Sequence, residues 1–333
     1  MRYRTLGNTD LQLSEIGFGG WTIGSDWWGH IDDVEATRML NRALDLGITY
    51  YDTADQYGEG RSERLIGQAF KGRRDRVVIG GKFGYDFYNH RRSEGHSEMP
   101  QNFEPSFIRF ALEQSLSRLQ TDYLDLWLVH NARMNSIEDS AVWQTLEDLR
   151  RDGKVRHYGV ALGPAIGWEE EGLRTMRTRS IDSMQIIYNL LEQDPGRSFF
   201  PTAAERGVGL RVRVPHSSGL LEGKYTLETT FPANDHRNFR KREWLVEGLK
   251  KLEQLRFLTN GKRATIGQVA LRFCLAQPTI STVLPNIYGM EQLEEFAAAG
   301  DAPDLTDAEM NRVNGLYEKN FSLLKNEVAA SAG

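Results

Sequence analysis

Short apolar runs rich in β-branched and aromatic residues alternate with amphipathic helical patterns along this chain of 333 residues. Such runs indicate buried strands, and strands separated by helices form parallel sheets because the helix returns the chain to the same edge. The alternation occurs eight times without a linker or a shift in composition. It therefore predicts an α/β fold, a (β/α)8 TIM barrel formed by residues 1–333 as one domain. The expected strands are residues 16–20, 48–51, 77–81, 124–129, 155–161, 183–188, 208–214 and 280–284.

Segments outside this alternation predict a hairpin and long loops. Residues 2–5 and 11–13 alternate in polarity around Gly-Asn-Thr-Asp, which is typical of an N-terminal β-hairpin. Residues 83–104 and 217–240 are polar and lack a periodic apolar pattern. Runs of this length inside a compact domain are usually functional, so we expect long loops at the C-terminal face of the barrel. The tail after about residue 320 is expected to fray or to pack over the barrel mouth.

Titratable side chains stand where three of the predicted strands end. Asp52 follows the second strand, with Tyr57 five residues later, Lys82 follows the third, and His130 follows the fourth. Taken singly, such residues are usually a helix cap, a core tyrosine, a solvated lysine and a satisfied interior histidine. Together they are placed for proton transfer, because the C-terminal ends of parallel strands carry the active sites of α/β barrels.

The loop after the first predicted strand is rich in indoles. It contains Trp21, Trp27, Trp28 and His30 beside several glycines. Two interpretations stay open: these side chains form a pocket wall, or they cover the barrel mouth without touching a ligand. In the first case Trp21, Trp28 and His30 contact the substrate together with Tyr57 and His130.

Composition excludes several classes of function. A net charge of −5 and a pI near 5.9 give no electrostatic footprint for nucleic acid or an anionic membrane. Cys274 is the single cysteine, so an internal disulfide or a thiolate metal cluster is impossible, and no metal site is predicted. The start of the sequence lacks an apolar signal core and no window reaches about 18 apolar residues. We expect a soluble cytoplasmic protein without nucleic-acid or membrane partners.

Four fragments in order resemble the aldo-keto reductase superfamily. They comprise Asp52 and Tyr57 in YYDTADQYGEGRSERLIG, Lys82 in VVIGGKFG, and His130 in DYLDLWLVHN. The likeness extends from about residue 3 to about residue 298. The resemblance implies a (β/α)8 barrel whose N-terminal hairpin plugs the floor, and an NAD(P)(H)-dependent interconversion of a carbonyl compound and an alcohol. Its substrate would be an aldehyde, a ketone or a keto-sugar.

The four residues have complementary chemistry for this reaction. A carbonyl that accepts hydride becomes an alkoxide and needs a proton, which Tyr57 would supply as general acid. The ammonium of Lys82 is expected to lower the pKa of the phenol, and Asp52 is expected to hold that ammonium in place. His130 would orient and polarise the carbonyl oxygen.

A cofactor site across the barrel mouth is also implied by the resemblance. No G-x-G-x-x-G element follows a predicted strand, so a Rossmann site is not indicated. The resemblance favours NADP(H) slightly over NAD(H). It matches the cofactor contacts Gly20, Trp21, Asp52, Gln185, Arg213, Pro215, Ser217, Gly219, Leu220, Lys224, Gln292 and Glu295.

The sequence departs from the family at several of these contacts. Ala161 and Leu162 stand where the family usually has Ser-Asn, and Arg213 replaces the aromatic residue that stacks on nicotinamide. The basic residue expected for the 2′-phosphate is replaced within residues 285–289, which leaves NAD(H) open. Two alternative functions also stay open, a redox-neutral lyase or epimerase on the same acid-base set and a non-catalytic regulatory subunit. The sequence does not define the substrate, the direction of the reaction or the oligomeric state.

Overall fold

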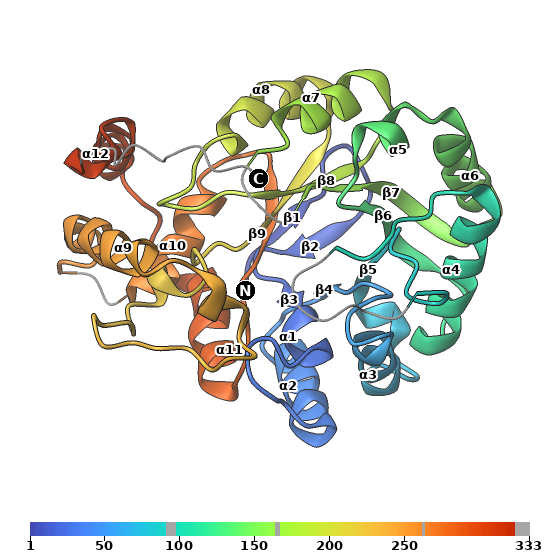
Figure 1. Cartoon of the computed structure of the whole chain (residues 1–333), viewed down its shortest axis with the longest axis horizontal. Coiled ribbons are helices and arrows are strands. Elements are labelled where there is room, and N and C mark those ends of the chain that lie inside the picture. Colours follow the sequence, from blue (N-terminus) through green and yellow to red (C-terminus); the bar gives the residue numbers. More distant parts are fainter. Residues whose placement is uncertain (91–97, 164–166, 262–263, 324–333) are drawn as a thin grey trace.

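The structure is a closed barrel of parallel strands surrounded by helices (Figure 1). It is a computed structural model that describes residues 1–90, 98–163, 167–261 and 264–323. Eight strands in this part of the chain lie side by side in sequence order. They are β3 (Phe18–Gly19), β4 (Tyr50–Asp52), β5 (Val78–Phe83), β6 (Leu124–His130), β7 (Val155–Ala161), β8 (Ser183–Ile187), β9 (Gly209–Arg213) and β10 (Ile280–Leu284).

Backbone hydrogen bonds join the first and last strands and close the sheet. The Gly17 amide donates to the Val283 carbonyl at 2.8 Å, and the Val283 amide donates to the Glu15 carbonyl at 2.9 Å. Ile16 and Val283 form a parallel bridge at the same place. The predicted (β/α)8 barrel is therefore confirmed.

Helices cover the outside of the barrel (Figure 1). Three of the helices were not predicted from the sequence. They are the short α1, where a loop was expected, and α5 and α12. Thr306 and Glu309 form a capping box at the start of α12. The α-helices are α1 (Trp21–Gly24), α2 (Asp33–Asp45), α3 (Arg61–Ala69), α4 (Pro105–Leu119), α5 (Met134–Glu138), α6 (Ser140–Arg151), α7 (Glu169–Thr178), α8 (Gly196–Arg206), α9 (Arg242–Gln254), α10 (Ile266–Leu275), α11 (Met290–Ala297) and α12 (Asp307–Glu318).

Alternation along each strand divides the core into two layers. In β6, Trp127 and Val129 pack with the helices, whereas Leu126 and Leu128 belong to a separate apolar cluster inside the barrel. Successive side chains of a strand point to opposite faces, so every second residue faces the barrel axis. His130 continues the inward series at the C-terminal end of β6.

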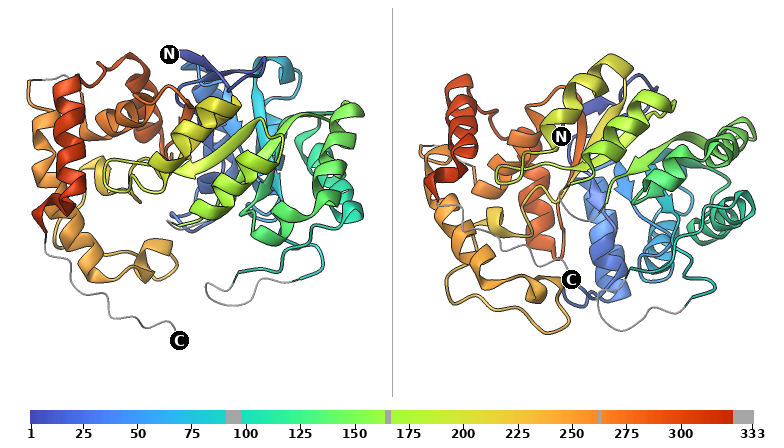
Figure 2. Two further views of the ribbon diagram at one scale, coloured as in Figure 1. Left: turned by 90° about the horizontal axis from the view of Figure 1, so that it is seen from above. Right: turned by 45° about the horizontal axis from the view of Figure 1, so that its top comes forward.

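The N-terminal hairpin closes one end of the barrel, as predicted. β1 (Tyr3–Thr5) pairs antiparallel with β2 (Gln12–Ser14). Leu6, Leu11 and Leu13 are buried in the interior cluster with Tyr50 and Leu126. Figure 2 shows the hairpin at one end of the barrel, away from the segment that connects β9 to α9. The opposite end is the one that receives the strand C-termini.

The long loops contain short helices and contacts of their own. Between β9 and α9 lie the 3-10 helices η2 (Leu220–Glu222) and η3 (His236–Phe239). The amide of His236 donates to the Trp27 carbonyl at 3.2 Å, which ties this segment to the first loop at the barrel mouth. Part of the predicted loop 83–104, including His96, and the tail from residue 324 lie outside the described residues. Among the described helices, none combines the length and apolar character that a membrane crossing requires.

Candidate active site

The period of two along the strands brings polar residues to the inner side of the barrel. Asp52 ends β4 with the same parity as the interior Tyr50, and Lys82 and His130 occupy inward positions near the ends of β5 and β6. Asp52 is 4% exposed, Lys82 is fully buried, and His130 is 3% exposed. Apolar layers below them fix these side chains at the mouth of the barrel.

The carboxylate of Asp52 is the centre of a buried hydrogen-bond network. Lys82 Nζ forms an ion pair with Asp52 Oδ1 and donates to the Thr53 carbonyl at 2.9 Å. On the other oxygen, Oδ2, three donors converge at 3.0 Å each: the Tyr50 hydroxyl, Gln185 Nε2 and Arg211 NH1. Two cations and two neutral donors therefore hold one carboxylate in place.

Tyr57 lies above this network and beside His130. The two ring centroids are 5.9 Å apart with an interplanar angle of 79°, and Lys82 Nζ lies 5.0 Å from the centroid of the Tyr57 ring. Asp52, Tyr57 and His130 line a cavity of about 490 Å³, here called the inner chamber. The structure thus places Asp52, Tyr57 and His130 on the wall of the inner chamber, and Lys82 is buried beside it in an ion pair with Asp52.

Burial dominates the titration of the residues around the inner chamber. It lowers the pKa of Lys82 to about 8, although the neighbouring Asp52 carboxylate opposes this shift. Burial, assisted by the Lys82 charge, lowers the pKa of His130 well below its usual value, so its imidazole is neutral. Burial also raises the pKa of Tyr57, and Asp52 adds to the rise. The expected lowering of the phenol pKa by Lys82 is therefore wrong for this structure.

Sequence interpretation missed Arg211 as a site residue. Its side chain is fully buried, donates from Nε to the Ser183 hydroxyl at 2.8 Å, and contacts both Tyr50 and Asp52. A signal existed in the GLRVR run of β9, where arginines alternate with Leu210 and Val212. Charged residues at every second position of a buried strand indicate an inward polar face.

The indoles of the first loop form the roof of the inner chamber. Trp21, Trp27 and Trp28 all line it, together with His236 from η3. Trp28 is 6% exposed and packs between the Arg237 guanidinium, 4.0 Å from the ring centroid, and the Tyr288 ring at 5.9 Å. The indoles therefore line the inner chamber, as the pocket-wall interpretation requires, and their contact with the substrate stays a prediction.

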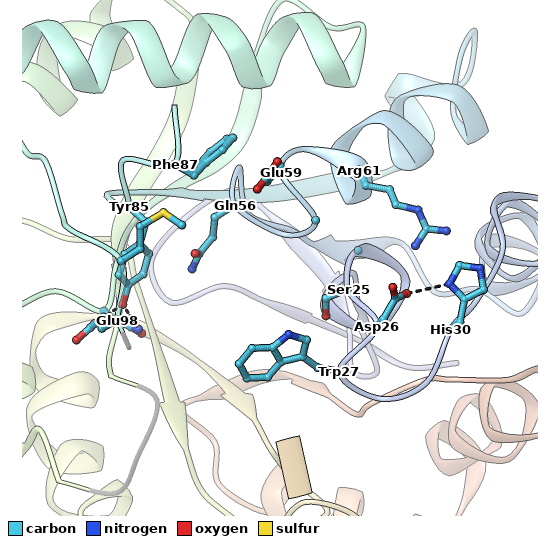
Figure 3. Close-up of a pocket in the computed structure, with 14 residues that line it drawn as sticks. Ser25, Asp26, Trp27, His30, Gln56, Glu59, Arg61, Tyr85, Phe87 and Glu98 are labelled. Carbon is cyan, nitrogen blue, oxygen red and sulfur yellow. Dashed lines mark hydrogen bonds and ion pairs between the residues drawn. The ribbon is translucent and has the colours of Figure 1, made fainter. Parts of the chain in front are cut away.

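His30 occupies a different place from the other predicted substrate residues. Its side chain is 69% exposed and its Nδ1 lies 2.9 Å from Asp26 Oδ1. It lines a second cavity of about 850 Å³, here called the outer chamber, and does not line the inner one (Figure 3).

The comparison with family models identifies the family of the chain. Residues 15–318 match the model described as "Aldo/keto reductase family". The chain belongs to this family. An aldo/keto reductase is an NAD(P)-dependent oxidoreductase, and the arrangement of Asp52, Tyr57, Lys82 and His130 at the strand ends accords with that class.

Known aldo/keto reductases are similar to this chain over nearly its whole length. "Aldo-keto reductase YhdN" of Bacillus subtilis is 34% identical, with 97% of this chain and 95% of that protein covered. "NADH-specific methylglyoxal reductase" of Escherichia coli is 29% identical, with 96% and 99% covered. The solved holo form of "aldo-keto reductase AKR11C1" from Bacillus halodurans is 30% identical with a TM-score of 0.77, covering 95% and 96%.

Several of the predicted cofactor contacts of this aldo/keto reductase lie at the inner chamber. Trp21, Asp52, Gln185 and Arg213 line it. Arg213 donates from NH2 to the backbone carbonyl of Leu162 at 3.0 Å. Two of the positions at which the sequence departs from the family are therefore in contact with each other. The Gly20 amide donates to the Asp52 carbonyl at 2.7 Å, which fixes the loop after β3 against β4.

The segment after β9 approaches the chamber with an unusual backbone. Pro215, Ser217 and Leu220 are buried, and Ser217 and Gly219 have φ angles of 46° and 92° in the left-handed region. The Ser217 hydroxyl donates to Glu192 at 3.1 Å. The amides of Ser217 and Gly219 donate to the carbonyls of Val214 and His216 at 3.1 and 3.0 Å, so the segment is a tightly turned loop held by its own backbone hydrogen bonds.

The remaining predicted cofactor contacts lie farther from the chamber. Lys224 is bound to Glu291 at 3.2 Å, and Glu295 accepts a hydrogen bond from Thr265 at 2.6 Å. Gln292 is 8% exposed on α11. None of these three lines the inner chamber.

Side chains of the inner chamber fit the nicotinamide end of a dinucleotide. Five buried polar atoms on residues that line it have no hydrogen-bond partner in the described part of the chain: Trp28 Nε1, His130 Nδ1, Asn131 Oδ1, Arg213 Nε and His236 Nδ1. Arg213 and Arg240 add positive charge for a pyrophosphate. No group of three or more potential metal ligands occurs among the described residues.

Proposed function

We propose that this aldo/keto reductase interconverts a carbonyl compound and an alcohol, with Tyr57 as the general acid in reduction and the general base in oxidation. The substrate would be an aldehyde, a ketone or a keto-sugar. The observation that carries the proposal is the convergence of Tyr57, His130 and the Asp52–Lys82 ion pair at one chamber.

Each side chain has a distinct part in this reaction. A reduced nicotinamide, when bound, supplies hydride to the carbonyl carbon. Tyr57 keeps its proton at neutral pH because burial raises its pKa, so the phenol is available as a donor to the developing alkoxide. The neutral imidazole of His130 donates a hydrogen bond to the carbonyl oxygen. The Lys82 ammonium, held by Asp52 below the ring of Tyr57, stabilises the phenolate that remains.

The indoles and the segment after β9 would exclude water from this step. Trp21, Trp27 and Trp28 close the chamber on one side, and His236 and Arg240 close it on the other. Removing water strengthens the interactions of Lys82 and His130 with the developing charges.

The choice between NADP(H) and NAD(H) rests on two lines of argument. Resemblance to the family favours NADP(H) slightly. The surroundings of Glu222 support NAD(H) as the second candidate. Glu222 is 6% exposed and accepts a hydrogen bond from the Tyr288 hydroxyl. Burial raises the pKa of Glu222 to about 7, and the negative charge of Glu295, on the expected adenine side, contributes to the rise. Above this pH the ionised carboxylate would accept from a ribose hydroxyl and repel a 2′-phosphate.

Titration of the purified protein with the four nicotinamide cofactors tests this proposal. Fluorescence quenching of the indoles at the chamber gives a Kd for each, and a panel of aldehydes and ketones gives turnover. If Glu222 selects NAD(H), Glu222→Gln tightens NADPH relative to NADH by about tenfold. Absence of binding and of turnover would overturn the proposal.

Two alternatives are less well supported. A redox-neutral lyase or epimerase would exchange a substrate α-proton with solvent without consuming cofactor. A regulatory subunit would bind cofactor without turnover. The relatives reported above carry reductase names, which supports hydride transfer over both.

We further propose one barrel domain over residues 1–333 and a cytoplasmic location. A single cooperative unfolding transition and cell fractionation test these two points.

A further inference from the structure

The outer chamber adjoins the inner chamber and has no part in the reaction described above. Its walls come from the loops after β3, β4, β5 and β6, and Figure 3 shows Trp27, Gln56 and Tyr85 around it. Trp27, Gln56 and Asn131 line both chambers. These three residues therefore mark the passage between the place of hydride transfer and a larger space of about 850 Å³.

We propose that the outer chamber holds the hydroxylated tail of a neutral polyhydroxylated carbonyl substrate, whose carbonyl end lies in the inner chamber. The inference rests on the proposed function, because it requires that Tyr57 and His130 receive the carbonyl.

Asn131 carries the first part of the argument. It directly follows His130, its φ is 50°, a left-handed conformation that asparagine tolerates, and its side chain is 6% exposed. Its Nδ2 donates to the Tyr85 hydroxyl at 2.6 Å, whereas its buried Oδ1 has no partner among the described residues. A buried acceptor of this kind requires a donor. A substrate hydroxyl in the passage supplies it, and a purely apolar chain does not.

The charges of the outer chamber carry the second part. Its walls contain the carboxylates of Asp26, Glu59 and Glu98 and the guanidinium of Arg61. Arg61 is committed elsewhere, because its Nε and NH2 donate to Asp33 at 2.9 and 2.6 Å and its NH1 donates to the Ile23 carbonyl at 2.8 Å. Among the described residues that line the chamber, three carboxylates thus stand beside one guanidinium, which is itself paired with Asp33.

Glu59 is the carboxylate best placed to meet a substrate. Asp26 is paired with His30, and Glu98 is paired with Arg133 and Tyr85. Glu59 is exposed and has no ion-pair partner in the described part of the chain. Figure 3 shows it near Gln56, whose amide end points into the chamber. Carboxylate and amide groups accept hydrogen bonds from hydroxyls, and the carboxylates repel a phosphate ester.

Matched substrates test the inference through kcat/KM for reduction. The pairs are glyceraldehyde with propanal, which lacks the hydroxyls, and erythrose with erythrose 4-phosphate. We expect glyceraldehyde to exceed propanal by about tenfold or more, because a site with an unpaired acceptor discriminates against an analogue without the donor. We expect erythrose to exceed its phosphate by about fivefold or more.

Variants locate each preference. Asn131→Ala should bring the glyceraldehyde to propanal ratio near one. Tyr85→Phe removes the acceptor of the Asn131 Nδ2 bond and the hydroxyl donor to Glu98 but leaves Asn131 Oδ1 in place, so the ratio should persist. Glu59→Lys should lower the erythrose to erythrose 4-phosphate ratio by about fivefold. The charge-matched control Glu205→Lys, on the exposed surface of α8, should leave that ratio unchanged.

Failure of this inference is distinguishable from failure of the proposed function. If propanal and all other carbonyl compounds remain unreduced with every nicotinamide cofactor, the proposed function itself fails. If propanal, glyceraldehyde and erythrose 4-phosphate are reduced as well as erythrose, the proposed function stands and this inference is overturned. A preference for cationic aldehydes over glyceraldehyde would also overturn it.

Discussion

Replacement of Asp52 by asparagine probes the network that positions the proposed acid. The substituted amide would retain one oxygen acceptor but no charge, so the buried cations Lys82 and Arg211 would lose their shared anion. Both cations are fully buried. Removing one partner of a buried ion pair costs about 3–5 kcal/mol, because the remaining charge is not solvated.

The expected shift in melting temperature follows from chain length. For 333 residues, the unfolding entropy near the melting temperature is about 0.7 kcal/mol per kelvin. Asp52→Asn should therefore lower the melting temperature by about 4–7 °C at pH 7. Scanning calorimetry measures this shift. Glu113→Gln, which breaks the half-exposed Lys154–Glu113 pair, is the control and should cost less than about 0.5 kcal/mol.

The pH dependence of the penalty tests its cause. The pKa of Lys82 is lowered to about 8, and Asp52 is the group that raises it against burial, so Asp52→Asn lowers it further. The native variant then loses its Lys82 proton at a lower pH than the wild type. The loss of unfolding free energy in Asp52→Asn therefore shrinks as pH rises to about 8, because up to this pH the native wild type binds more protons than the native variant. Above pH 8 the loss is constant, because Lys82 is deprotonated in both native proteins. A melting temperature within 1 °C of wild type, or a penalty independent of pH, would refute the reasoning.

Two further predictions concern the same cations. The kcat for reduction should fall as pH rises through about 8, because the Lys82 ammonium loses its proton there. Lys82→Arg should remove this alkaline limb of the pH–rate profile, since a guanidinium stays charged. The pH–rate profiles of both proteins check this. Arg211→Met should move the limb of the wild-type profile to higher pH, because the guanidinium of Arg211 lowers the pKa of Lys82. If the limb stays at the same pH, Arg211 does not influence the pKa of Lys82 and the prediction is contradicted.

The barrel could be predicted from the sequence because its signals are local. Apolar runs and helical periodicity identified all eight strands, and β7 and β10 have the predicted bounds. β3 and β4 differ at their ends, since hydrogen bonding to neighbours, not composition, decides where a strand begins. α12 was missed, although Thr306 and Glu309 carry the signature of a capping box.

The site could be predicted only in part. Strand ends indicated Asp52, Lys82 and His130, but the inward position of Arg211 required attention to the alternation in β9. The raised pKa of Tyr57 depends on how deeply the ring is buried, which a sequence does not contain. The outer chamber is formed by residues from four loops that are distant in sequence, so its joint lining by Gln56 and Asn131 emerges only in the fold.

Single-turnover reduction of glyceraldehyde by wild type and Tyr57→Phe tests the central claim most directly. The phenyl ring retains the packing against His130 but has no proton to give. The account predicts that wild type oxidises one nicotinamide for each carbonyl reduced, and that Tyr57→Phe binds the cofactor equally well but reacts about 100- to 10,000-fold more slowly. Equal hydride-transfer rates in the two proteins would contradict it.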